Sequence, residues 1–330
     1  MITEQRVNYK PFEYPQFDVY YMQQVNSRWT HDKIPMQKDI KDWKVELSAT
    51  DKQAIEMILK NFAQTETNIG TYWSSLVPKW FPKAEIISMA QEFASMEAMH
   101  AKAYSYLNEI LGLEDFKAFL EDDEIMERLE LLLVPEKETI ENIALSIAIF
   151  SAIFEGVLLY SSFTTLMSFK RNNLLKGTSQ QMVYSIRDES LHSKAGCELF
   201  RVLCSENPDL KESLKFKIIT SFIEGVNAEF KCIDKIFENG DLSTIKKSDL
   251  KMFIWNKANE KFKELGYDGA IFDLGTFDMS IFDWFFEEIA LKNDDFFVQR
   301  VTNYGEPNKD WQEDDLYSMI NKEISNEVQQ

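Results

Sequence analysis

Cysteine is scarce in this chain of 330 residues, which contains only Cys197, Cys204 and Cys232. An odd number of cysteines without disulfide-framework or zinc spacing argues against a disulfide-stapled module and fits a reducing compartment. Small buried thiols are the simplest interpretation of all three. The N-terminus also lacks the apolar run of a secretory signal. We therefore expect a cytoplasmic protein.

Positive charge is also in short supply, because 36 Lys and Arg face 55 Asp and Glu, for a net charge of −19. Such a surface repels phosphate backbones and anionic lipid, so neither nucleic acid nor a membrane surface is an expected partner. The 11 glycines form no Gly-rich phosphate-binding loop. What remains is a soluble, acidic protein whose chemistry lies in other residues.

Charge is nearly absent from one segment, residues 144–169, where Glu155 is the only charged residue. The segment is long enough to span a bilayer. However, it is the only such run, it is rich in Ser and Thr, and a glutamate near its centre would be costly in lipid. We predict a helix buried on all sides in the middle of a soluble bundle.

Proline is infrequent, and between Ser48 and Phe237 apolar residues recur with helical spacing, without strand-like alternation. The prolines of this region fall where helices would start or stop. The pattern predicts an all-α fold, with helices at about 50–74, 84–112, 122–133, 137–170, 179–205, 211–235, 247–265 and 279–291.

The two ends of the chain differ from this helical region. Residues 1–45 combine prolines with aromatic residues and predict an extended arm packed over the bundle. Residues 303–330 are polar and acidic, which predicts a flexible tail. We therefore expect one helical domain, residues 1–302, followed by the tail.

Histidine is rare too, yet two of the three histidines stand three residues after a glutamate: Glu97 with His100, and Glu189 with His192. This spacing puts a carboxylate and an imidazole one turn apart on one helix face, where both can bind the same metal ion. About thirty residues before each pair, an isolated acid interrupts an apolar stripe: Glu66 and Glu155. The repeated order is acid, then glutamate–histidine pair.

Four buried carboxylates would repel one another unless cations compensated them. Two divalent ions balance four carboxylates and two neutral imidazoles, which is the ligand set of ferritin-like dimetal carboxylate bundles. The sequence therefore predicts a dinuclear metal site held by Glu66, Glu97, His100, Glu155, Glu189 and His192. Oxygen-rich ligation favours iron or manganese over zinc or copper.

Three further residues are candidates for roles beside the metals. Tyr104 follows His100 by one turn, and Asp188 precedes Glu189, where it could accept a hydrogen bond from a ligating histidine. Trp29, in the N-terminal arm, could pack against this pair. Taken alone, Tyr104 also fits a core tyrosine, and Trp29 an aromatic anchor for the arm.

The chain resembles the β (radical-generating) subunit of class I ribonucleotide reductase. The resemblance rests on QTE at 64–66, SMEAMHAKAY at 95–104, FEGVLLY at 154–160, SIRDESLH at 185–192 and DFFVQRVTNY at 295–304. It implies a ferritin-like bundle with the six residues above as metal ligands. It further implies that Tyr104 bears a stable radical and that Trp29 and Asp188 begin a radical-transfer route.

The resemblance also implies partners and a reaction. An oxygen species activates the centre, and the stored oxidising equivalent passes to a catalytic α subunit that reduces ribonucleotides. The route ends at a tail tyrosine, for which Tyr317 is the first candidate and Tyr304 the second. The tail docks on α, the subunit forms a homodimer, and an activating flavoprotein is a possible further partner.

One departure concerns the metal. The commonest subclass has aspartate at the first ligand, and Glu66 is similar to manganese-using relatives. Manganese–iron relatives usually replace the radical tyrosine, whereas Tyr104 is present here. A pair of manganese ions or a pair of iron ions is therefore favoured over a mixed centre. If the ions are manganese, Tyr104 could serve only as a hydrogen-bonding neighbour of the metals.

Two other functions share much of this pattern. A ferritin-like iron-binding protein needs neither Tyr104, Trp29 and Asp188 together nor an acidic tail. A stand-alone ligand-binding dimetal oxidase shares the six ligands but acts on a hydrophobic substrate without an α subunit. Activation of a catalytic α subunit separates the ribonucleotide reductase function from both alternatives.

Overall fold

The structure is a computed structural model that describes residues 1–113, 135 and 137–290, apart from the side chains of residues 63–68. Within these ranges every regular element is helical, which confirms the predicted all-α class. The long helices are α3 (Ala49–Thr71), α5 (Ala84–Leu111), α9 (Lys176–Glu206), α10 (Leu210–Ile236) and α11 (Lys247–Glu264).

The predicted helix limits agree with the observed ones to within a few residues for these five helices. Local sequence accounts for several ends. Gly112 adopts a left-handed conformation (φ 75°) that closes α5, as glycine readily does. Pro82 and Pro208 lie in the breaks before α5 and α10. The helix predicted at 122–133 lies outside the described residues.

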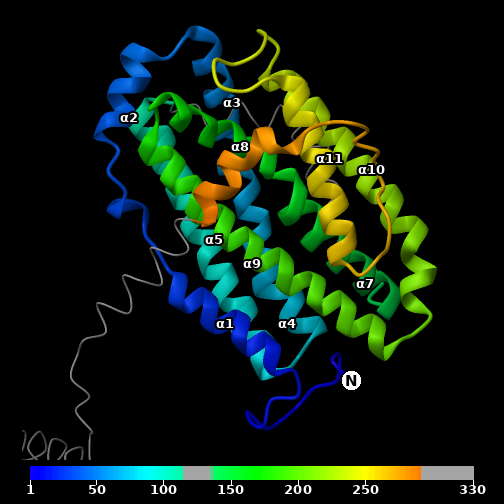
Figure 1. Cartoon of the computed structure of the whole chain (residues 1–330). Coiled ribbons are helices and arrows are strands. Elements are labelled where there is room, and N and C mark those ends of the chain that lie inside the picture. The colour runs from blue at the N-terminus through cyan, green and yellow to red at the C-terminus, as the bar shows by residue number, and fades with distance from the viewer. Residues whose placement is uncertain (114–134, 136, 291–330) are drawn as a thin grey trace, which may run out of the picture. The chain divides into compact units, whose positions relative to one another are not determined.

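The long apolar run forms the centre of the bundle (Figure 1). It consists of α7 (Ile140–Ala148), a π-helical segment (Ile149–Leu158) and α8 (Tyr160–Ser168), packed between α9, α10 and α11. Thr139 caps α7 by accepting a hydrogen bond from the backbone N–H of Asn142 at 3.3 Å. The helical stretch Ile140–Asn172 could cross a membrane by length and composition, but 94% of its apolar window is buried. It is thus a core helix, as predicted.

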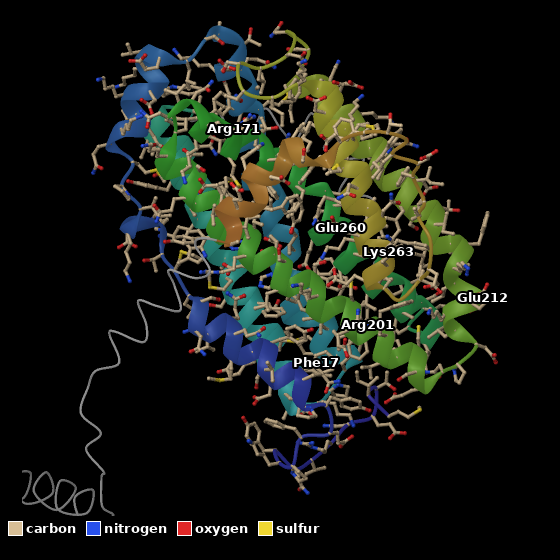
Figure 2. All side chains as sticks on the ribbon, viewed as in Figure 1. Phe17, Arg171, Arg201, Glu212, Glu260 and Lys263 are labelled. Atoms are coloured by element: carbon tan, nitrogen blue, oxygen red, sulfur yellow. The ribbon has the colours of Figure 1, made fainter. Side chains whose placement is uncertain are left out.

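On the other side of the molecule, α3 packs along α5, and α1 (Pro15–Ser27) lies against α5 and α9. The core between the helices is apolar and aromatic, and Phe17 of α1 is fully buried in it. Charged side chains such as Glu212 and Lys263 lie on the outside (Figure 2). The N-terminal region therefore contributes to the core.

The prediction of an extended N-terminal arm is wrong for residues 15–27, which form α1. Pro15 stands at the first helical position, where its fixed φ and missing N–H are tolerated. Phe17, Gln24 and Ser27 form the buried face of this helix. Three prolines suggested extended backbone, but a proline that starts a helix does not prevent one.

The remaining short elements connect these helices. They are α2 (Gln37–Lys41), α4 (Val77–Trp80), 3-10 turns at His31–Lys33, Phe169–Asn172 and Met279–Phe282, and π-helical segments at Asp42–Glu46 and Tyr72–Leu76. The last turn leads into helical residues 283–290. Residues Met1–Ile289 form one compact unit. The predicted boundary at 302 lies beyond the described residues and stays a prediction.

Candidate metal centre

Two glutamate–histidine pairs meet in the middle of the bundle. Glu97 and His100 come from α5, and Glu189 and His192 come from α9. Glu155 joins them from the π-helical segment Ile149–Leu158. All five side chains are at most 1% exposed. Buried charge of this density requires compensation inside the protein.

The distances show that each pair reaches across to the other. His192 Nδ1 lies 2.6 Å from Glu97 Oε1, and His100 Nδ1 lies 3.0 Å from Glu189 Oε1 and 3.2 Å from Glu97 Oε2. Ligand atoms of Glu97, Glu155, Glu189 and His192 all lie within 4.8 Å of one another. The two imidazole rings are 6.4 Å apart between centroids. Glu97 therefore lies close to both histidines, and Glu189 lies 3.0 Å from His100 and 3.9 Å from His192.

The donor set fits cations at this place. Both histidines use Nε2 for hydrogen bonds outside the cluster, so their Nδ1 atoms face the carboxylates. At 2.6 Å, His192 Nδ1 and Glu97 Oε1 would set lone pair against lone pair unless a proton or metal ion lay between them. Glu189 Oε2 is buried without a hydrogen bond and lies 3.9 Å from His192 Nδ1. These atoms suit oxygen- and nitrogen-preferring metal ions.

The electrostatics point the same way. Burial would raise the pKa of Glu97, but the charges of His192 and His100 outweigh it and hold that pKa well below its usual range. Burial and the negative charge of Glu97 raise the pKa of Glu189. Burial would lower the pKa of His100, yet Glu97 and hydrogen bonds to Asp188 and Glu189 raise it far above normal. The carboxylates thus strongly favour positive charge beside them.

Glu155 is positioned by an interruption in regular α-helix. It lies in the π-helical segment Ile149–Leu158, and its Oε1 accepts a hydrogen bond of 2.5 Å from Trp73 Nε1. Trp73 belongs to a second π-helical segment, Tyr72–Leu76. Such segments are rare and concentrate at functional sites, because the wider turn redirects a side chain. Helical periodicity alone did not predict either π segment or this hydrogen bond.

A hydrogen-bonded chain leads from the cluster to the N-terminal region. Asp188 Oδ2 accepts from His100 Nε2 at 3.1 Å and from Trp29 Nε1 at 2.7 Å. The Trp29 ring also stacks on the His100 ring at 5.9 Å, and Trp29 is only 8% exposed. Burial would raise the pKa of Asp188, but its hydrogen bond with His100 and the charge of Arg187 lower it. The carboxylate is therefore ionised and accepts both hydrogen bonds.

Gln24 is a site residue that sequence reasoning missed. Its amide Nε2 donates to Asp188 Oδ1 at 3.1 Å, and its Oε1 lies 3.1 Å from His192 Nε2. It is fully buried on α1. A helical pattern in residues 15–27 could have predicted this role, because a glutamine on the buried face of a helix needs polar partners.

Tyr104 lies one turn beyond His100 on α5 and is completely buried. Its ring stacks on Phe62 at 4.5 Å between centroids and lies 6.3 Å from the His100 ring. On the far side of Trp29, the half-buried Tyr184 lies 5.5 Å from the indole. Aromatic rings therefore flank the His100 side of the cluster in two directions.

The sequence profile of the ribonucleotide reductase small chain matches residues 6–273. The chain belongs to this family. A probable ribonucleoside-diphosphate reductase small subunit of Invertebrate iridescent virus 6 is 30% identical over 305 residues, covering 81% of this chain and 84% of the viral protein. This family membership confirms the resemblance found in the sequence.

Solved structures share the ribonucleotide reductase small-chain fold. A putative class I ribonucleotide reductase of Bacillus halodurans has a TM-score of 0.74 at 23% identity, covering 81% of this chain and 98% of the other. The dimanganese(II)-NrdF of Streptococcus sanguinis has a TM-score of 0.67 at 20% identity, covering 80% and 93%. An R2-like ligand-binding oxidase with a Mn/Fe cofactor has a TM-score of 0.66 at 20% identity, covering 77% and 94%. The buried carboxylate–histidine cluster thus lies within the fold that these solved structures share.

Three predicted site residues fall where the structure describes no side chain. The backbone of Glu66 is part of α3, but its side chain is outside the described residues. Tyr304 and Tyr317 lie in the undescribed range 291–330. Their assigned roles stay predictions.

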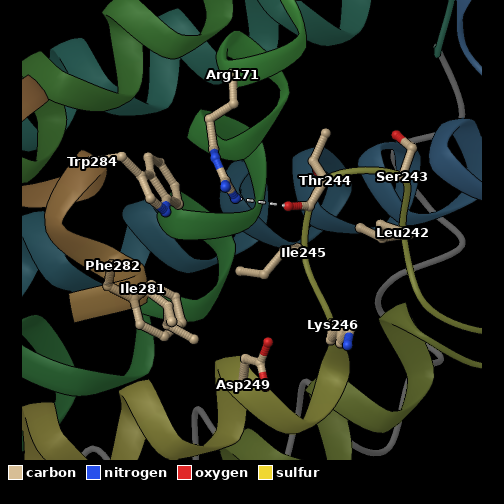
Figure 3. Close-up of a pocket in the computed structure, with 10 residues that line it drawn as sticks. All are labelled: Arg171, Leu242, Ser243, Thr244, Ile245, Lys246, Asp249, Ile281, Phe282 and Trp284. Carbon is tan, nitrogen blue, oxygen red and sulfur yellow. Dashed lines mark hydrogen bonds between the residues drawn. The ribbon is translucent and has the colours of Figure 1, made fainter. Parts of the chain in front are cut away.

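Surface pockets occur away from these residues. One of about 310 Å³ is lined by ten residues, among them Arg171, Thr244 and Trp284 (Figure 3). Arg171 donates to the Thr244 carbonyl at 3.1 Å and lies 5.2 Å from the Trp284 ring centre. The pocket shares no residue with the metal-ligand cluster, so it has no part in the chemistry of that cluster.

Proposed function

We propose that this chain is the radical-generating β subunit of a class I ribonucleotide reductase. In this role it stores an oxidising equivalent and passes it to a catalytic α subunit, which reduces ribonucleotides to deoxyribonucleotides. The observation that carries the proposal is the hydrogen-bonded chain His100–Asp188–Trp29, which connects the buried cluster to the N-terminal region. An iron store or a stand-alone oxidase has no need of such a connection.

Two metal ions would be held by six side chains: Glu66, Glu97, His100, Glu155, Glu189 and His192. When bound, such ions supply one-electron redox chemistry, activated by an oxygen species, that side chains alone lack. Either two manganese or two iron ions suit the oxygen-rich set, and Tyr104 disfavours a mixed manganese–iron centre by the argument from the family. The aromatic residues Trp73 and Phe93, both fully buried, exclude water from the His192 side.

The chain's own residues explain how an electron could leave Trp29 without building up charge in the core. Asp188 Oδ2 lies 2.7 Å from Trp29 Nε1, so the indole proton can shift toward the carboxylate as the ring is oxidised. Asp188 also accepts a hydrogen bond from His100 Nε2, which keeps His100 Nδ1 directed at Glu97 and Glu189. Stacking of the two rings at 5.9 Å keeps the electron-transfer distance short.

The remaining parts of the proposal come from the family. Tyr104 is the radical-bearing residue or, with manganese, a neighbour of the metals. Tyr317, or else Tyr304, relays the oxidising equivalent within the tail 303–330 that docks on α. The subunit is a cytoplasmic homodimer, with an activating flavoprotein as a possible partner. A synthetic peptide of residues 303–330 should compete with the whole chain for α and inhibit turnover; a peptide without effect would remove the tail from docking.

A ligand-binding oxidase is the second candidate, and the fold similarity to the Mn/Fe oxidase is the observation in its favour. It predicts a copurified lipid-like ligand and no effect on α. The β-subunit proposal predicts no copurified lipid-like ligand and turnover that depends on α. Ferritin-like storage predicts a protein shell that holds hundreds of iron ions.

The decisive experiment loads the metal-free protein with manganese or iron under an oxygen species, then assays ribonucleotide reduction with α. Elemental analysis and electron paramagnetic resonance are run on the same samples. We expect about two ions per chain, as the ligand set requires, and α-dependent turnover with one of the metals. A tyrosyl signal with iron alone would refute the dimanganese form, and a manganese multiline signal without a tyrosyl radical would refute Tyr104 as the radical store. Two bound ions with no turnover would refute the β-subunit function.

A further inference from the structure

Gln24 occupies an unusual place between the two halves of the cluster. It lies on α1, outside the helices that carry the ligands, yet its amide contacts the hydrogen-bonding shell of both histidines. We propose that Gln24 is a positioning residue that orients His192 for metal binding. It thereby couples binding of the metal ion held by His192 to the packing of α1 against α5 and α9. This inference rests on the proposed metal centre.

The amide can adopt only one orientation. Asp188 Oδ2 already accepts from Trp29 and His100, and Arg187 approaches Oδ1 at 3.3 Å, so Asp188 acts purely as an acceptor. Gln24 must therefore turn its NH₂ group toward Asp188 Oδ1, as observed at 3.1 Å. Its carbonyl oxygen is then left facing His192 Nε2. A carbonyl accepts and cannot donate.

This orientation determines the state of His192. Because Gln24 Oε1 can only accept, His192 Nε2 must carry a hydrogen. The lone pair of a neutral His192 is then at Nδ1, the atom that faces Glu97 at 2.6 Å. His100 is oriented in the same way by Asp188. The two histidines thus receive their orientation from one continuous chain: His100, Asp188, Gln24, His192.

The same chain holds α1 in place. Ser27 Oγ donates to the backbone carbonyl of Gln24 at 3.2 Å, and Arg187 of α9 donates to the backbone carbonyl of Ser27. Trp29, two residues further on, is bound to Asp188. A metal ion that fixes His192 therefore also fixes Gln24 and the end of α1. Linkage is reciprocal, so a docked α1 must favour the metal to the same extent.

The test compares metal-free wild type, Gln24→Leu and a matched control, Gln53→Leu, as full chains. Gln53 is a partly buried glutamine of α3 whose amide donates to Glu238 at 3.2 Å, away from the histidines. Each protein is titrated with Mn²⁺ against a competing chelator. Loss of an outer-shell partner typically weakens metal binding about 10–100-fold, so one of the two Mn²⁺ steps should weaken by this factor in Gln24→Leu. The other step and Gln53→Leu should match wild type.

Hydrogen exchange over residues 15–34 gives the second readout. Mn²⁺ should slow exchange there in wild type and in Gln53→Leu, and should lose this effect in Gln24→Leu. A merely structural Gln24 would give fast exchange in the variant with unchanged Mn²⁺ affinity, which would overturn the inference. If Gln24→Leu does not fold, Gln24→Asn replaces it, because its shorter side chain keeps an amide that cannot span both partners. Weaker Mn²⁺ binding in this variant would support the inference, and unchanged Mn²⁺ affinity would overturn it.

The two proposals fail separately. Wild type that binds fewer than two Mn²⁺ ions would refute the dimanganese centre, and this inference with it. Two tight Mn²⁺ steps in both wild type and Gln24→Leu would refute the role of Gln24 alone. Absence of turnover with α would refute the proposed function and leave the linkage standing.

Discussion

Asp188 is the residue on which the most hydrogen bonds of the site converge. Side chains of Gln24, Trp29, His100 and Arg187 all donate to its two oxygens. A buried carboxylate with this many donors stays ionised and rigid. It therefore holds one imidazole and one indole in place with one oxygen while its other oxygen accepts from Gln24 and Arg187, where the amide of an asparagine would present donors instead.

Replacing Trp29 tests this arrangement directly. Trp29→Phe keeps a ring against His100 but removes the hydrogen bond to Asp188 Oδ2. We expect turnover with α to fall to background while the protein still binds about two metal ions per chain, because Trp29 is not one of the six proposed ligands. Activity and metal content are measured on the same sample.

The matched control for that substitution is Trp80→Phe. Trp80 is equally buried and donates its indole N–H to Glu138 at 3.0 Å, apart from the cluster. It should retain turnover. Full activity in Trp29→Phe would remove Trp29 from the route.

The cysteines are expected to be chemically inert. All three are buried thiols outside any disulfide, and burial raises the pKa of Cys197 to about 12 and of Cys204 to about 11. At pH 8 the thiolate fraction of Cys197 is about one in ten thousand, and thiolate is the reactive form. Ellman's reagent should therefore detect no rapidly reacting thiol in the native protein and three after unfolding. Rapid labelling of the native state would contradict this burial.

At the scale of elements, the central helix departs from regular α-helix where the chemistry is. The π-helical segment Ile149–Leu158 places Glu155 against Trp73 and lies close to α9. Gly196 of α9 permits that approach: a Cβ at this position would lie 1.8 Å from Ser151 Oγ and 2.5 Å from Ser151 Cβ. The two elements can pack this closely only without a side chain at 196.

Gly196→Ala should therefore push the π-helical segment away from α9. Overpacking of this kind costs about 1–3 kcal/mol, which we expect to appear as a lower midpoint of thermal unfolding of the metal-free protein. Metal content should also fall, because His192 lies one turn before Gly196 on the same helix. The double variant Gly196→Ala with Ser151→Gly removes the clash and should recover part of the loss; equal destabilisation in both would contradict the packing explanation.

At the scale of the whole molecule, the proposed metal centre predicts that stability depends on metal. Carboxylates from α5, α9 and the central segment converge there on two imidazoles. Ions bound there would hold three elements together, because the ligands are brought into one place only in the folded chain. Metal binding is therefore coupled to unfolding.

Metal removal should lower the thermal unfolding midpoint. At a free metal concentration one hundred times Kd, each site adds about 2.7 kcal/mol to the free energy of unfolding. Unfolding entropy is about 2.1 cal/mol/K per residue, so for the unit Met1–Ile289 two sites correspond to a shift of roughly 9 °C. Thermal scans in manganese and in chelator measure this, and coinciding transitions would argue against a stabilising dimetal centre.

Much of this protein is readable in its sequence. Periodicity gave the helices α5, α9, α10 and α11 with nearly correct limits, and one-turn spacing gave the two glutamate–histidine pairs. Both signals are local, because they depend on residues three or four positions apart. The arm failed as a prediction because Pro15 is compatible with either a helix start or an extended chain.

The sequence by itself determined the all-α class, the acidic surface and which side chains are candidate ligands, since helix geometry places near neighbours on one face. Only the tertiary structure decided that His192 faces Glu97 of the other pair, that Trp73 binds Glu155, and that Gln24 contacts His192 from 168 positions away. These contacts join different helices, and their geometry depends on packing and on π-helical turns. No local pattern encodes the distance between two helices, so the hydrogen-bonded chain around the cluster emerged only from the fold.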